Sequence, residues 1–203
     1  MKELPNLREE YRTMVQVFNR MVALSTEEWD AFFPFLQVKK AGRSQILLEA
    51  GQPSKSCFFI VEGLVRFFYL TFEGKERNKG FYGKHQIVGG LSSLILNEPS
   101  RFSIETLEPS VLVEIPSRLF MDLKVRHLGW ERFFNLCCQL MLIRNERREA
   151  ELLTQTPKAR YLQFVRNFPE YKNRIPQYHI ASYLGITPVA LSKYKKPWLS
   201  AAD

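Results

Sequence analysis

The chain changes its periodicity at Pro116, and this change constrains the fold more than any other feature of the sequence. Before Pro116, short runs rich in β-branched and aromatic residues recur about every 8–12 residues, with glycine- or proline-containing turns between them. In residues 117–154 there is no proline, and the apolar residues take a helical spacing. The sequence therefore predicts an α+β chain with an antiparallel β-sandwich or barrel first and helices afterwards.

Two local signals add detail to the β-rich part. Glu73-Gly74 separates two alternating runs, a pattern typical of a β-hairpin. Ahead of the strands, residues 24–35 predict a helix that Ser25 or Thr26 caps, with an apolar stripe behind the cap. We expect residues 1–116 to form one domain with short helices at its start.

The region 117–153 predicts a long helix with a narrow apolar seam. A β domain of this size offers such a helix little else to pack on, so a parallel dimer with a second copy is favoured over packing within the chain. The predicted seam consists of Phe133, Leu136, Leu140, Ile143 and Arg147.

The last fifty residues are predicted to form a small basic domain, residues 154–203. They contain eight Lys and Arg against two acidic residues, a net charge of +6 out of +8 for the whole chain. A basic unit at one end of a nearly neutral body indicates a polyanionic partner.

Residues 177–196, "QYHIASYLGITPVALSKYKK", predict what this domain binds. Gly185 allows the left-handed backbone that ends a first helix, Thr187 can cap a second, and Pro188 suits its first position. Two short helices joined in this way form a helix-turn-helix, whose second helix lies in the major groove of DNA. An ordinary pair of packed helices is the alternative.

We expect the DNA contacts to come from the start of the first helix and from the second helix. Pro197 is expected to end the second helix early, which would leave few phosphate contacts. The predicted DNA-binding residues are Gln177, Thr187, Pro188, Val189, Ser192, Lys193, Lys195 and Lys196.

Over nearly its full length the chain resembles the CRP/FNR superfamily of bacterial transcription regulators, especially the subset found in Bacteroidetes-type genomes. The resemblance rests on "IASYLGITPVALSK", "EGLVRFFYLTFEGKE" and "VGGLSSLILNEPSRFSIETLEPSVLVEI". It implies a cyclic nucleotide-binding-like jelly roll, a dimerisation helix that transmits an effector signal, and a winged helix-turn-helix. The implied partners are double-stranded DNA, a second copy of the chain, RNA polymerase and a small-molecule effector.

The stretch that is similar to the family's phosphate-binding cassette departs from the cyclic-AMP-binding pattern. Gly90 stands where those members have the glutamate that holds the ribose, and Arg101 is shifted and lacks a following hydroxyl. Losing that charge-assisted hydrogen bond removes roughly 1.5–3 kcal/mol, so we expect no response to cyclic AMP. A pocket for another small anion would be lined by Gly89, Gly90, Ser92, Ser93 and Arg101.

The recognition helix departs as well, because Pro188, Val189 and Lys193 stand where the cyclic-AMP receptor protein has Arg, Glu and Arg. We therefore expect a different operator. The competing hypothesis is a ligand-binding module whose DNA domain is degenerate and which acts through a protein partner.

Other functions find little support in the sequence. Three cysteines without CxxC spacing predict neither a disulfide framework, a zinc site nor an iron–sulfur cluster, and the isolated His85 and His127 do not indicate haem. We expect no metal, no cofactor and no catalytic residue. A charged N-terminus and the lack of a long apolar run predict a cytoplasmic protein that does not enter membranes.

Overall fold

The computed structural model describes residues 7–199, with side chains as far as Tyr194. It divides into two compact units, and the limits of these units differ from the predicted boundaries at 116 and 153. The first unit comprises Met1–Phe67 and Phe81–Met141, and the second comprises Phe68–Gly80 and Leu142–Asp203. The long helix and one hairpin thus contribute residues to both units.

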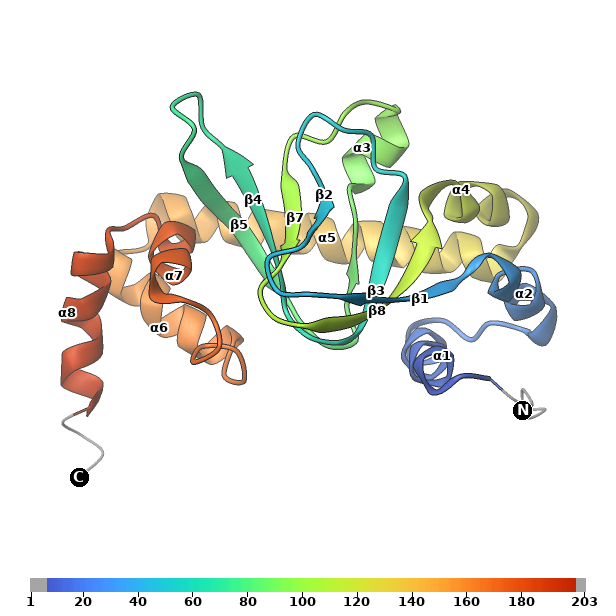
Figure 1. Ribbon diagram of the computed structural model, residues 1–203, viewed down its shortest axis with the longest axis horizontal. Coiled ribbons are helices and arrows are strands. Elements are labelled where there is room, and N and C mark those ends of the chain that lie inside the picture. Colours follow the sequence, from blue (N-terminus) through green and yellow to red (C-terminus); the bar gives the residue numbers. More distant parts are fainter. Residues whose placement is uncertain (1–6, 200–203) are drawn as a thin grey trace. The chain divides into compact units, whose positions relative to one another are not determined.

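In the part of the chain that the structure describes, eight strands form two four-stranded sheets, as the turn-punctuated sequence predicts (Figure 1). The sheet orders are β1-β8-β3-β6 and β2-β7-β4-β5. The turn at Glu73-Gly74 is confirmed between β4 and β5, with Gly74 at φ +74°. The strands are β1 Gln37–Ala41, β2 Ile46–Leu48, β3 Ser56–Glu62, β4 Val65–Leu70, β5 Glu76–Tyr82, β6 Ile87–Val88, β7 Ser103–Thr106 and β8 Ser110–Pro116.

Aromatic side chains fill the space between the two sheets. The ring of Phe67 lies 4.2 Å from that of Tyr82 and 5.0 Å from that of Phe102, measured between centroids. Phe58 and Ile104 are buried in the same cluster. These side chains form the core of this part of the roll.

A second aromatic cluster packs helices onto strands β3 and β8. Phe18 of α1 (Glu9–Met21), a helix that the sequence analysis does not assign, lies 4.4 Å from Phe133 between ring centroids. Phe133 is only 1% exposed. The prediction that Phe133 belongs to a dimer seam is therefore wrong, because the seam spacing coincides at this point with the face that packs on the core.

The region predicted as one helix contains two, α4 (Ser117–Arg126) and α5 (Leu128–Thr154), with extended backbone at His127. Glu28 of α2 (Thr26–Asp30) holds the start of α5. Its carboxylate completes a capping box with Ser25 and accepts the Gly129 N–H at 2.7 Å. A Cβ on Gly129 would lie 2.3 Å from that carboxylate, so only glycine permits this approach.

The remainder of α5 leaves apolar side chains exposed. Leu140 is 51% and Ile143 43% exposed, Arg147 lies on the same face, and Leu136 is half-buried. Four of the five predicted seam residues thus share one face of the helix, which is at least partly open in the single chain.

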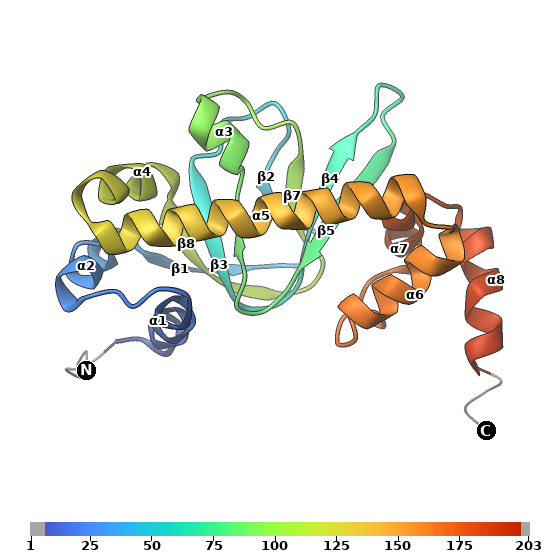
Figure 2. The same ribbon diagram turned by 180° about the vertical axis from the view of Figure 1, so that it is seen from behind.

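The second unit contains α6 (Pro157–Asn167), α7 (Gln177–Leu184) and α8 (Pro188–Leu199), which follow the C-terminal end of α5 (Figure 2). No strand follows β8 within residues 7–199, so the wing that the family resemblance implies is not seen in that part of the chain. The remaining helical elements are the 3-10 turn η1 (Phe33–Phe35) and α3 (Leu91–Leu96). None of the helices described in residues 7–199 is both long enough and apolar enough to cross a bilayer.

Candidate nucleic-acid interface

The turn between α7 and α8 has the predicted geometry. Gly185 adopts φ +69°, the left-handed conformation, and its N–H bonds back to the Ser182 carbonyl at 3.2 Å. Thr187 caps α8, because its Oγ1 accepts the Ala190 N–H at 3.2 Å. Pro188 is the first residue of α8, where its missing N–H costs nothing.

A small apolar core joins the two helices. Ile180, Ala181 and Leu184 of α7 and Leu191 of α8 are all buried. These are the positions at which the helical spacing predicts an inward face. The turn and the core together produce a helix-turn-helix and not an irregular corner.

Two arginines hold the C-terminal end of α7. The guanidinium of Arg148 in α5 stacks over the ring of Tyr183 at 3.8 Å and donates to the Tyr183 carbonyl. Arg160 of α6 donates from Nε to the Leu184 carbonyl at 3.0 Å. Positive charge at a helix C-terminus complements the helix dipole, so both contacts orient α7.

The predicted DNA-reading side chains point outward. Gln177, Thr187, Pro188, Ser192 and Lys193 are exposed, and Val189 is 71% exposed. The Ser192 hydroxyl donates to the Pro188 carbonyl at 3.0 Å and keeps its lone pairs outward. The side chains of Lys195 and Lys196 lie outside the described ones.

The prediction that Pro197 ends the recognition helix is wrong, because α8 extends over twelve residues, from Pro188 to Leu199. A proline in the last turn removes one backbone hydrogen bond, to the carbonyl four residues earlier, and the helix continues past this loss. The short helix was one of two features that favoured a degenerate DNA domain, and Pro188 is the other.

The sequence analysis missed a set of contacts on the opposite side of α7. Asn78 of β5 meets both His179 and Ser182 of α7, across about a hundred positions of sequence. No short motif contains these residues, so no local pattern could have indicated the contact.

The structure places the residues of the predicted anion pocket in different surroundings. The Ser93 hydroxyl accepts the Ser54 N–H at 3.0 Å, and the Gly90 N–H donates to Ser54 Oγ at 3.0 Å. A Cβ on Gly90 would lie 2.9 Å from Ser54 Cβ, and a Cβ on Gly89 would lie 2.7 Å from the sulfur of Cys57. Ser92 and Arg101 are exposed.

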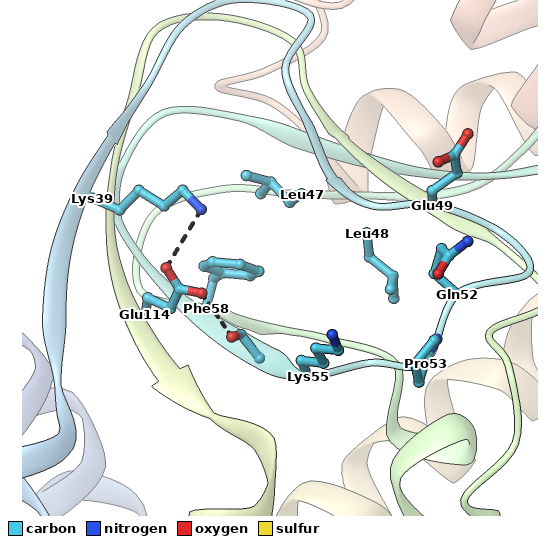
Figure 3. A pocket seen from close by; sticks show the side chains of 10 residues that line it. Lys39, Leu47, Leu48, Glu49, Gln52, Pro53, Lys55, Phe58 and Glu114 are labelled. Atoms are coloured by element: carbon cyan, nitrogen blue, oxygen red, sulfur yellow. Dashed lines mark hydrogen bonds and ion pairs between the residues drawn. The ribbon is translucent and has the colours of Figure 1, made fainter.

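The roll instead has a hollow of about 270 Å³ elsewhere, which the sequence did not indicate (Figure 3). Its polar wall is an ion pair between Lys39 and Glu114 at 3.4 Å, and the Ser56 hydroxyl donates to the same carboxylate at 2.7 Å. Phe58 and Leu48 supply the apolar floor. The hollow is lined by Lys39, Leu47, Leu48, Glu49, Gln52, Pro53, Lys55, Ser56, Phe58 and Glu114.

The arrangement of a β-roll, a long helix and a helix-turn-helix agrees with the fold found in the comparisons with known proteins. Residues 38–127 match the family described as "Cyclic nucleotide-binding domain". Among solved structures, FixK2 from Bradyrhizobium japonicum aligns with a TM-score of 0.71 and 16% identity, over 82% of this chain and 85% of that one.

Two further proteins are similar. The c-di-GMP responsive global regulator CLP from Xanthomonas campestris aligns with a TM-score of 0.68 and 14% identity, over 87% of this chain and 93% of that one. An "Anaerobic regulatory protein" from Pasteurella multocida is 24% identical in an alignment of 185 residues that covers 84% of this chain. The chain covers 66% of that relative's length, slightly less than two thirds.

The fold of this chain is therefore the one that these solved structures share.

Proposed function

We propose that this protein is a transcription regulator that binds operator DNA as a homodimer through α7 and α8. The observation that carries the proposal is the exposed face at the start of α8, after a left-handed glycine and a capping threonine. Thr187 and Ser192 supply hydroxyls and Lys193 a positive charge, which suit phosphates and base edges in a major groove. Val189 offers an apolar contact for a thymine methyl group.

A homodimer supplies a second copy of α7 and α8, the pair of helices that we call the reading head. Leu140 and Ile143 are exposed on a face of α5 that a second copy would cover. A symmetric dimer places two recognition helices against two half-sites about one helical turn apart. The operator of this protein is therefore pseudo-palindromic.

The effector of this protein is not cyclic AMP. Gly90 has no side chain for the ribose, and the Phe67 ring packs against Tyr82 and Phe102 between the two sheets. Support comes also from Ser54 and Ser93, whose hydroxyls are bonded within the cassette. The proposal also includes regulation by another small molecule and contact with RNA polymerase, which the family resemblance implies.

Fluorescence anisotropy with a duplex selected from a random library tests the proposal. Lys193→Gln should weaken operator binding about tenfold and lower the steepness of the salt dependence by about one charge per protomer, which is about two charges for the dimer. Lys40→Gln is the matched control, because it removes the same charge from an exposed site on β1. Cyclic AMP should leave both affinities unchanged.

Failure to bind any duplex at low salt, by a protein that sediments as a folded dimer, would overturn the proposal. It would favour the second hypothesis, a ligand-binding module that acts through a protein partner. Equal effects of Lys193→Gln and Lys40→Gln would show that binding is electrostatic only and not made through α8.

A further inference from the structure

β5 is the last strand of its sheet, and α7 lies against its edge. The Asn78 N–H donates to Ser182 Oγ at 3.0 Å, and the Ser182 hydroxyl donates to the Glu76 carbonyl at 3.2 Å. One serine thus pairs with a donor and an acceptor two residues apart on the strand. This is the pairing that a neighbouring strand would otherwise provide.

The Asn78 side chain adds a second connection to the same turn of α7. Its Nδ2 lies 3.2 Å from His179 Nδ1 and donates to the His179 carbonyl at 3.3 Å. Both side chains are buried, Asn78 at 7% and His179 at 5% exposure. Because buried polar groups are costly when unpaired, such a contact forms in one geometry and is not readily replaced by another.

The hairpin also reaches α5. Lys79 Nζ donates to Asn145 Oδ1 at 3.3 Å, one turn before Arg148, which holds the C-terminal end of α7. The hairpin residues 68–80 therefore pack as part of the same compact unit as the helix-turn-helix. Their strands nevertheless continue along the chain into the sheet β2-β7-β4-β5.

We propose that Glu76, Asn78, His179 and Ser182 form a clamp that holds α7 in its DNA-binding orientation and links strands β4 and β5 directly to the reading head. The clamp is a second connection, besides α5, through which the β-roll can influence the helix-turn-helix. It positions the reading head and does not mask it, because Thr187, Val189 and Lys193 remain exposed. A helix-turn-helix that is already held in its binding orientation loses less orientational freedom when the dimer binds both half-sites, and the affinity for DNA is higher as a result. This inference rests on the proposed function.

Ser182→Ala tests the clamp, since alanine suits a helix and removes only the bridging hydroxyl. The Asn78 amide should exchange its hydrogen faster in the full-length dimer. Affinity for the selected two-half-site operator should fall about tenfold, whereas affinity for a single half-site duplex should stay unchanged. Lys75→Ala, in the turn of the same hairpin, is the control and should change neither reading.

The two measurements fail separately. Unchanged exchange at Asn78 overturns the contact, whatever the DNA result. Faster exchange with unchanged or tighter operator binding overturns the positioning role. If the wild type binds no duplex, the proposed function and the clamp's role in DNA binding fall together, while the exchange result still decides the contact. Should Ser182→Ala fold poorly, Asn78→Ala removes the side-chain amide that contacts His179. This variant should likewise lower affinity for the two-half-site operator and leave affinity for the single half-site unchanged.

Discussion

At the scale of single residues, Gly90 shows how packing excludes a ligand contact. Its N–H bonds to Ser54 Oγ, and the same serine leaves no room for a Cβ at Gly90. A glutamate at this position could not be added without displacing the loop before β3. The glycine that replaces the glutamate of the cyclic-AMP-binding pattern is thus matched by Ser54, which packs against it.

Gly90→Glu should therefore fail to create a cyclic-AMP site. We expect it to lower the free energy of unfolding by about 1–3 kcal/mol, the usual cost of overpacking. Urea unfolding and titration with a fluorescent cyclic nucleotide check both expectations. Ser92→Glu, at an exposed position of the same segment, is the control and should be nearly neutral. Tight nucleotide binding by Gly90→Glu with wild-type stability would contradict the argument.

Burial strongly displaces the titration of Cys137. Burial, followed by the neighbouring Cys138 and Cys57, raises the pKa of the Cys137 thiol to about 12. In the unfolded chain a thiol titrates near 8.5. The folded state therefore holds this proton at pH values at which the unfolded state has lost it.

The stability that Cys137 contributes should be complete below about pH 8.5 and decline as the pH rises toward 12. Urea unfolding at several pH values between 8 and 11 should show this decline. The stability contributed by buried tyrosines with raised pKa values, such as Tyr183, should also decline as the pH rises. The variant Cys137→Ala measures the contribution of this thiol, because the free energy of unfolding of the variant should fall less steeply with pH than that of the wild type. An identical slope would show that Cys137 does not contribute to the decline.

At the scale of elements, α5 serves two purposes along its length. Its first part, with Trp130 and Phe133, packs in the core beneath α1 and α2. Its later part exposes Leu140 and Ile143. The change occurs within about two turns, so one apolar spacing covers both a core face and an open face.

Leu140→Glu should break the dimer. Each protomer loses a buried leucine, worth about 1.5–3 kcal/mol, and the two copies together should raise the dimer dissociation constant at least a hundredfold. Analytical ultracentrifugation measures this constant. Leu142→Glu is the matched control, because Leu142 is also exposed but points to another side of the helix. Equal dissociation in both variants would place the interface elsewhere.

At the scale of the whole molecule, the proposed function requires two reading heads on one face of DNA. Insertion of about five base pairs between the half-sites turns one of them by half a helical turn. We expect operator affinity to fall at least tenfold in anisotropy measurements, and an insertion of about ten base pairs to restore part of it. No difference between the two insertions would show that one head binds alone.

How much the sequence could predict depended on the distance over which each feature acts. The hairpin turn at Gly74, the helix end at Gly185 and the cap at Thr187 were predicted correctly, because each depends on the backbone within a few residues. The alternation of strands and the later helical spacing likewise predicted the two sheets and α5, because periodicity shows which face is buried.

What only the tertiary structure decided are contacts between distant segments. The burial of Phe133, the anchoring of Gly129 by Glu28, and the packing of Gly90 against Ser54 depend on partners far away along the chain. The pairing of Ser182 with the edge of β5 spans more than a hundred residues. Local spacing encodes which side of an element is apolar, but which neighbour covers that side emerges only when the whole chain packs.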